Sequence, residues 1–242
     1  MIQSRYNITM SEVKKMALLT LLHGSSQIVE KPELARGKEY NDYGRGFYCT
    51  QDEDLAREWA CKNGTDGFVN RYELDTDGLQ TLDLSDGAHT VLDWIALLLK
   101  YRTFRLSSSI AMDARTYLID HFAPDVSQVD LIVGYRADDS YFQFAQSFVE
   151  NTLPLRALGQ ALRLGNLGVQ TALVSEKAFA RIRFMGAEAT DKNIYYPKFS
   201  RRDRDARLRY ANEVARSASY RDDIFVLDIL RQEMQNDDPR LR

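Results

Sequence analysis

Cysteine is scarce in this chain, and its scarcity excludes several kinds of site. Among 242 residues only Cys49 and Cys61 occur, and they form no C-x-x-C pair. Two cysteines placed in this way cannot build a structural zinc site or a disulfide framework. A reducing compartment, the cytoplasm, is therefore the simplest location for the protein.

Long apolar runs and an excess of positive charge are also missing. No stretch of about 18 apolar residues occurs, so we expect no membrane span, and the polar start of the chain predicts no signal peptide. The net charge of −3 argues against a generally basic nucleic-acid binder. P-loop, H-E-x-x-H and G-x-S-x-G motifs are lacking, and Cys49 stands where a dinucleotide fingerprint needs its third glycine.

What is present is the composition of an ordinary globular protein, 44% hydrophobic and 28% charged. Short apolar stretches predict strands over 17–22, 47–49, 68–74, 81–84, 129–134 and 169–174. Helical patterns cover about 10–16, 91–101, 107–122, 141–150, 155–163 and 175–184. Because strands and helices do not alternate regularly, the order favours an α+β fold over a doubly wound sheet.

The last part of the chain, 186–242, differs in character from 1–185. Five arginines and two aspartates fall within 200–209, and the spacing of apolar residues predicts at least two helices. We interpret 186–242 as a charged helical extension of the main domain 1–185. Its simplest interpretation is a solvated charged surface, and the alternative is an arm that contacts a partner or a nucleic acid.

The stretch 42–50 indicates a turn, a strand and a helix cap in succession. Its two glycines predict a turn whose backbone approaches another group closely. Thr50 is placed as a helix N-cap, and Glu53 completes a capping box. The helix that follows carries Trp59 on its apolar face.

Three pieces of sequence form an ordered set: His-Gly-Ser at 23–25, Gly-Arg-Gly-Phe-Tyr at 44–48, and Trp59, which lies eleven residues after Tyr48. This set resembles the ADP-ribosyltransferase superfamily, in the His–Tyr–Glu branch that includes poly-ADP-ribose polymerases and diphtheria toxin. The segment from about 20 to 185 is more closely similar to an uncharacterised bacterial family of that superfamily, named only as a domain of unknown function. The resemblance implies a split, strongly bent antiparallel β-sheet that holds NAD in a cleft, with inserted helices and a helical C-terminal extension.

The resemblance assigns NAD contacts to His23, Gly24, Ser25, Gly46, Tyr48, Thr50 and Trp59. His23 and Ser25 would act at the nicotinamide-side ribose, and the backbone of Gly24 would pair with the carboxamide. Tyr48 and Trp59 would stack on the two faces of the pyridinium ring. Each residue also has a purely structural interpretation, as a hydrogen-bonded strand end or as core packing.

The third catalytic position departs from the family pattern. The superfamily places a glutamate on a late strand, where it grips the ribose 2′-hydroxyl, whereas this chain offers Gln170 and has Ala172 in place of a second acidic position. A glutamine orients a ligand by hydrogen bonds but supplies neither charge nor a base. Asp138, Asp139 and Glu176 are candidates for the missing carboxylate, and all three are also ordinary turn or cap residues.

The sequence thus leads us to expect a mono-ADP-ribosyltransferase with His23, Tyr48 and Gln170 as its catalytic residues and no metal. It would transfer ADP-ribose from NAD to a macromolecular acceptor, protein or nucleic acid, as a bacterial effector, toxin or regulatory modifier. One alternative is an NAD glycohydrolase, with water as the acceptor. The other is a non-catalytic pseudo-transferase that binds a partner through its arginine-rich extension.

Overall fold

The structure is a computed structural model that describes residues 18–137, 139–164, 168–217 and 222–241. Within these residues the chain forms seven strands and eight α-helices, which makes the protein α+β, as expected. The helix predicted over 10–16 lies outside the described residues.

The strands form one mixed sheet in the order β4-β5-β6-β2-β1-β3-β7. Their bounds are β1 (Leu18–Ser25), β2 (Phe47–Thr50), β3 (Gly67–Asp75), β4 (Thr81–Asp83), β5 (Leu131–Tyr135), β6 (Val169–Leu173) and β7 (Ile182–Thr190). All neighbouring pairs are antiparallel except β4 and β5, which are parallel. The expectation of a wholly antiparallel sheet is therefore wrong at this edge.

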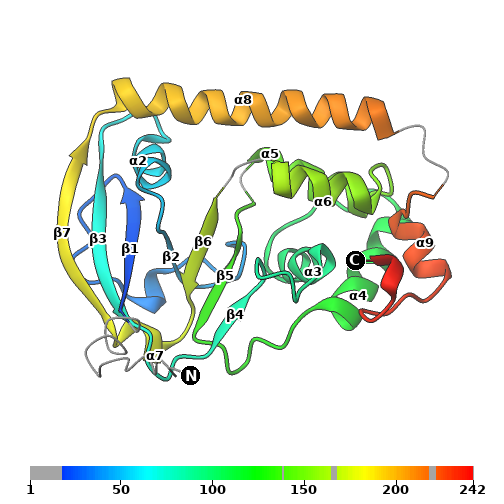
Figure 1. Cartoon of the computed structure of the whole chain (residues 1–242), viewed down its shortest axis with the longest axis horizontal. Coiled ribbons are helices and arrows are strands. Elements are labelled where there is room, and N and C mark those ends of the chain that lie inside the picture. The colour runs from blue at the N-terminus through cyan, green and yellow to red at the C-terminus, as the bar shows by residue number, and fades with distance from the viewer. Residues whose placement is uncertain (1–17, 138, 165–167, 218–221, 242) are drawn as a thin grey trace, which may run out of the picture.

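The sheet is nearly divided between β1 and β2. These two strands pair only at Leu22 and Thr50, whereas β1 pairs with β3 along its whole length and β2 pairs with β6 along its whole length. In Figure 1 the strands β7, β3 and β1 accordingly form one group and β6, β5 and β4 another, with β2 between them. Where the pairing of β1 with β2 stops, the adjacent ends of the two strands are accessible to a ligand.

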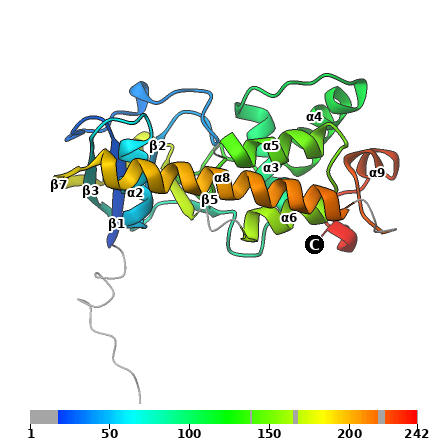
Figure 2. The ribbon, with the colours of Figure 1, turned by 90° about the horizontal axis from the view of Figure 1, so that it is seen from above.

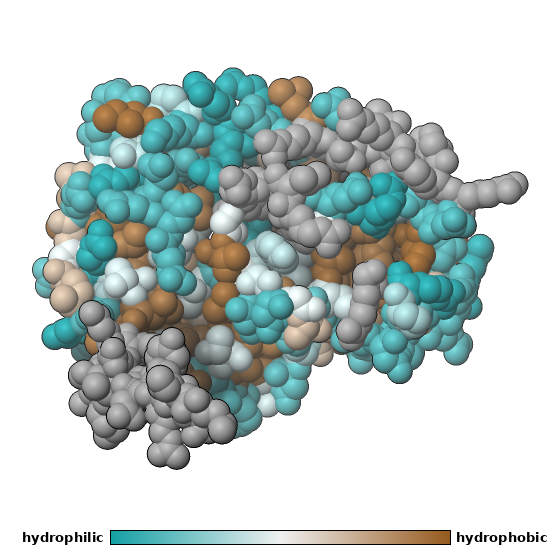
Figure 3. Space-filling view, viewed as in Figure 1, coloured by the Kyte–Doolittle hydropathy of each residue, from teal (hydrophilic) through white to brown (hydrophobic). Residues whose placement is uncertain are grey.

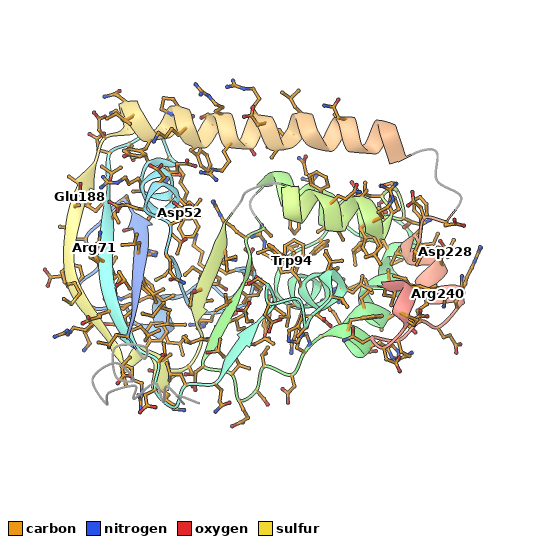
Figure 4. The ribbon with its side chains drawn as sticks, viewed as in Figure 1. Asp52, Arg71, Trp94, Glu188, Asp228 and Arg240 are labelled. Carbon is orange, nitrogen blue, oxygen red and sulfur yellow. The ribbon has the colours of Figure 1, made fainter. Side chains whose placement is uncertain are left out.

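The helices are α2 (Glu53–Cys61), α3 (Val91–Tyr101), α4 (Ser109–Phe122), α5 (Asp139–Val149), α6 (Leu155–Leu164), α7 (Glu176–Phe179), α8 (Lys192–Ser217) and α9 (Val226–Arg231). Helix α3 is buried on all sides, since every residue from Leu92 to Leu99 is inaccessible or nearly so. Its Trp94 lies in the interior of the helical half (Figure 4) and donates a hydrogen bond of 3.0 Å to the Tyr135 carbonyl.

Helix α8 runs across both halves of the molecule (Figures 1 and 2). One end contacts α2, and positions farther along contact α5 and α6. Its Ala206 is buried in the main hydrophobic core, and β7 continues the sheet through residue 185, where we had placed the end of the main domain. The charged extension is therefore packed along much of its length against the rest of the protein.

Two local predictions are wrong for identifiable reasons. The N-cap of α2 is Asp52, whose side chain accepts from Leu55 N at 3.0 Å, while Thr50 is still part of β2 and accepts from Asp52 N at 3.1 Å. The helix predicted over 175–184 ends at Phe179. Alternate residues of the next segment pack on the sheet instead, as in the edge-on contact of Phe184 with the Tyr72 ring at 5.7 Å, so pairing with β3 extends the backbone.

Hydrophilic residues predominate on the face drawn in Figure 3, and hydrophobic residues are visible in smaller groups between them. None of the described helices combines the length and the apolar character needed to cross a bilayer.

Candidate functional site

A cavity of about 680 Å³ opens where the sheet divides between β1 and β2. This volume lies within the range of small-molecule sites, about 300–1,000 Å³. The predicted residues that line it are His23, Gly24, Gly46, Tyr48, Trp59 and Gln170. The remaining wall comes from the segment 27–42, the residues after β5, α8 through Phe199 and Asp203, and the single residues Phe47, Lys62 and Arg102.

His23 bridges the two strands at the point where their ladder stops. Its Nδ1 lies 2.7 Å from the carbonyl oxygen of Tyr48, in place of a further backbone pair between β1 and β2. A carbonyl only accepts, so Nδ1 carries the proton and Nε2 is an acceptor. Burial lowers the pKa of His23, the Tyr48 carbonyl opposes this shift, and Lys62 adds to it. His23 is therefore neutral at pH 7 and able to accept from a ligand hydroxyl.

Tyr48 is fixed by the turn that precedes its strand. Its hydroxyl donates to the Gly44 carbonyl at 2.7 Å and accepts from Tyr43 N at 3.0 Å. Burial raises the pKa of Tyr48 far above its usual range, so the phenol stays protonated. Because the hydroxyl is already engaged, the ring is the part of Tyr48 that it offers to a ligand.

Gln170 lies at the start of β6 and is held through its amide nitrogen. Nε2 donates to Asp42 Oδ2 at 2.9 Å and to the Tyr135 carbonyl at 3.3 Å. Both partners are acceptors, and this fixes which end of the amide is nitrogen. The carbonyl oxygen Oε1 is consequently the acceptor end of this lining side chain, on the side of the amide away from Asp42.

Asp42 is the buried one among the carboxylates that line the cavity, with 6% of its surface exposed. Its Oδ1 accepts from Arg102 Nη1 at 2.7 Å, and its Oδ2 accepts from Ala137 N at 2.9 Å in addition to Gln170. The acid thus connects the segment before β2, the end of α3, the segment after β5 and the start of β6. Buried charge requires such pairing and hydrogen bonding.

Trp59 enters the cavity from α2. The guanidinium carbon of Arg136 lies 4.7 Å from the centroid of its indole ring, a cation–π contact. The indole Nε1 is buried and has no hydrogen-bond partner among the described residues. A buried N–H without an acceptor costs on the order of 1–3 kcal/mol, so this tryptophan is left polar and unsatisfied beside the cavity.

Two cavity glycines are required by close approaches within the protein. A Cβ on Gly24 would stand 1.9 Å from the Ala56 carbonyl oxygen, so α2 rests directly on the end of β1. A Cβ on Gly46 would stand 2.7 Å from the Leu173 carbonyl oxygen. The close backbone approach predicted for the glycines of 42–50 is confirmed at Gly46, where the group approached is β6. At Gly24 the group approached is α2, and the contact with a carboxamide that the resemblance implies stays a prediction.

Ser25 and Thr50, which the resemblance placed on the ligand, are not in the cavity lining. Ser25 Oγ donates to the Gln27 carbonyl and accepts from Asn70 Nδ2 at 3.4 Å. Thr50 is buried, and its Oγ1 donates to the Val169 carbonyl at 3.3 Å. The hydroxyl groups of Ser25 and Thr50 therefore hold in place the backbone segments whose neighbouring residues line the cavity.

Of the three carboxylates considered from the sequence, only Glu176 has a described side chain. Glu176 is exposed at the start of α7, beyond the end of β6 opposite Gln170, and does not line the cavity. Asp138 lies outside the described residues, and the side chain of Asp139 is not described. Asp42 was missed, although it stands within the stretch 42–50, because no spacing in the sequence shows that this turn reaches β6.

Cationic side chains outnumber acidic ones around the described cavity. Its lining contains three carboxylates, from Glu33, Asp42 and Asp203, and six cations, from Lys31, Arg36, Lys38, Lys62, Arg102 and Arg136. A concave site with an excess of positive charge attracts anionic ligands such as phosphates. In the described part of the chain, no group of three or more His, Cys, Asp or Glu side chains could hold a metal ion.

Comparison with known proteins gives a family and no closer relative. No curated protein and no solved structure was found to match the chain. Residues 19–184 match the family described as "Protein of unknown function (DUF3990)", and the match spans β1 and most of the sheet and helices, including every lining residue named above except Phe199 and Asp203. Since these residues make up well over half of the sequence, the chain belongs to the DUF3990 family.

Proposed function

We propose that this protein is a mono-ADP-ribosyltransferase that uses NAD as donor and a macromolecule as acceptor. The observation that carries the proposal is the meeting of His23, Tyr48, Trp59 and Gln170 around one cavity, although they belong to four different elements, β1, β2, α2 and β6. Its volume and its cationic lining suit a dinucleotide, which combines flat rings with a pyrophosphate.

Each lining residue has a chemical task in this proposal. Nε2 of His23 and Oε1 of Gln170 accept hydrogen bonds from ribose hydroxyls, and the rings of Tyr48 and Trp59 contact the nicotinamide. A cationic ring on an aromatic face gains on the order of 0.5–2 kcal/mol. Arg136 now covers the Trp59 ring, so it moves aside when a ligand ring stacks there.

The transfer itself breaks one bond and forms another at the same ribose carbon. The carbon–nitrogen bond to nicotinamide breaks, and its electron pair leaves with the nicotinamide nitrogen. A nucleophilic atom of the acceptor supplies the new pair and releases its proton to solvent. Acceptor groups held around the ribose favour the positive charge that develops on it, as in glycoside hydrolysis.

One observation favours a second candidate, a protein that binds NAD without transferring ADP-ribose. Gln170 is neutral, and the nearby Asp42 is already paired with Arg102, so less negative charge is available to the developing cation than a free carboxylate would provide. This candidate retains the cavity and its ligand but predicts no turnover.

The test follows free nicotinamide and macromolecule-bound label together, after labelled NAD is added to the purified protein in a cell lysate. We expect bound label with the wild-type protein and its loss in His23→Ala. The matched control is His121→Ala, because His121 hydrogen-bonds Gln235 and does not line the cavity. Thermal unfolding verifies that both variants fold.

Four outcomes are distinguishable. Label lost only in His23→Ala supports the transferase, and nicotinamide release without bound label indicates a glycohydrolase. NAD binding by calorimetry without either product supports the non-catalytic protein. Equal labelling by wild type and His23→Ala, or absence of NAD binding by the wild type, overturns the proposal.

A further inference from the structure

We infer that Asp42 is the positioning carboxylate of this site and that it acts through Gln170, presenting the glutamine oxygen as an obligatory hydrogen-bond acceptor. The inference rests on the proposed function for the identity of the ligand. It assigns the acid to the segment before β2, although sequence reasoning placed the corresponding position on β6.

The first step of the argument is that the Asp42 carboxylate can only accept. Three donors point at it: Arg102 Nη1 at 2.7 Å, Ala137 N at 2.9 Å and Gln170 Nε2 at 2.9 Å. With 6% of its surface exposed, the acid relies on these donors rather than on water.

The second step concerns the glutamine. An amide has one donor end and one acceptor end, and turning it over would place Oε1 against Asp42 Oδ2 and against the Tyr135 carbonyl. Acceptor–acceptor contacts in a buried site are unfavourable. Asp42 therefore locks the amide, and the acceptor Oε1 faces the ligand. A ribose hydroxyl, which can donate, fits this atom.

The third step explains why the residue on β6 is a glutamine. A glutamate at position 170 would bring a second carboxylate to within about 3 Å of Asp42, and two such groups cannot both stay ionised. The introduced acid would take up a proton or turn away from Asp42, and either change disturbs the acceptor. Gln170 supplies the same shape with a donor on the side of Asp42.

The experiment is a double-mutant cycle with Gln170→Glu, Asp42→Asn and the doubly substituted protein, measuring the dissociation constant of NAD by calorimetry at pH 8. We expect Gln170→Glu to weaken binding at least tenfold, because one pKa unit of repulsion corresponds to a tenfold change. In the double variant the introduced asparagine donates to the introduced glutamate, so binding recovers at least tenfold relative to Gln170→Glu.

Asp42→Asn places one donor against another in both proteins that carry it. In the single variant the amide nitrogen faces Arg102, and in the double variant it faces Ala137 N–H as well as the introduced glutamate. This cost lowers the recovery expected in the double variant, so recovery in spite of it supports the coupling. Gln170→Leu serves as a charge-free control, expected to weaken NAD binding about tenfold because it removes the acceptor.

Additive effects, with a coupling within twofold of unity, overturn the inference. If Asp42→Asn alone does not fold, recovery of folding and of NAD binding in the double variant carries the same meaning, and failure of both overturns the inference. Absence of NAD binding by the wild type overturns the proposed function instead. The same cycle on urea unfolding then decides whether Asp42 and Gln170 are coupled at all.

Discussion

Two buried carboxylates of this protein are each paired with an arginine, yet their surroundings differ. Glu58 on α2 gives both oxygens to one partner on α8, with Arg202 Nε at 2.8 Å from Oε2 and Nη2 at 2.8 Å from Oε1. Asp42 gives one oxygen to Arg102 and shares the other between Ala137 N and the amide of Gln170.

The difference separates a structural ion pair from one that is connected to the cavity. The Glu58 pair is a bidentate contact between two helices, and Glu58 is not part of the cavity lining. The Asp42 pair fixes an amide that does line it. Burial and charge alone would not distinguish the two carboxylates, whereas the hydrogen bond from Gln170 to Asp42 does.

The largest effect is expected on breaking the structural pair. Glu58→Ala leaves the Arg202 guanidinium without its bidentate partner, and we expect the free energy of unfolding in urea to fall by about 2–4 kcal/mol. NAD binding should stay within twofold of the wild type under conditions where the variant is folded.

Asp54→Ala is the matched control for Glu58→Ala. It removes the contact of Asp54 with Lys198 at 3.2 Å between the same two helices, but both side chains are largely exposed. A loss of less than about 1 kcal/mol is expected. If Glu58→Ala weakened NAD binding as strongly as Asp42→Asn, the distinction between the two carboxylates would be lost.

A smaller effect is expected from the pH dependence of His23. Burial lowers the pKa of His23 in the folded protein. Above pH about 6.5 the His23 side chain is therefore neutral in both the folded and the unfolded state, and it contributes no pH dependence to the stability. Below that pH the unfolded chain binds a proton that the folded protein does not, and stability falls by up to about 1.4 kcal/mol per pH unit.

The measurement compares urea unfolding of the wild type and of His23→Asn between pH 7 and pH 5. We expect the free energy of unfolding of His23→Asn to fall less between pH 7 and pH 5 than that of the wild type. The fall for His121→Ala should match that of the wild type. If the free energy of unfolding depends on pH with the same slope in His23→Asn and in the wild type, burial between β1 and β2 does not keep His23 neutral.

The smallest effect is expected at the aromatic wall. Arg136→Ala uncovers the Trp59 ring, and a cation–π contact of this kind contributes roughly 0.5–1 kcal/mol. A flat cationic probe without phosphates, nicotinamide riboside, should therefore bind about two- to fivefold more tightly, as followed by tryptophan fluorescence. Trp59→Phe is the control, because the other tryptophan, Trp94, is fully buried. Unchanged or weaker binding would contradict competition between Arg136 and a ligand ring.

The elements with strong local signals were predicted well. Helix α3 has the predicted bounds, 91–101, because its apolar run is long and its start carries a capping box from Thr90 and Asp93. The strand predicted over 68–74 lies within β3. The segment 182–190 was missed because its sequence alone does not show that the edge of β3 is available for pairing.

The site was predicted in part. His23, Tyr48, Trp59 and Gln170 were named from the resemblance to the ADP-ribosyltransferase superfamily, and they line one cavity. Their roles toward NAD stay a prediction. Thr50 and Ser25 belong to the same pattern, but their hydroxyls serve the backbone beside the cavity. The direction of these hydroxyl groups depends on strand alternation and on local turns, and a sequence motif does not contain this information.

The sequence by itself determined the strands and helices with strong periodicity and the positions where the backbone must approach another element. The tertiary structure decided that the ladder between β1 and β2 stops after one pair, which opens the cavity. It also decided that Asp42 meets Arg102, 60 residues away, and Gln170, 128 residues away. The physical reason is that a buried carboxylate is stable only where several donors converge, and this convergence depends on how separate elements pack.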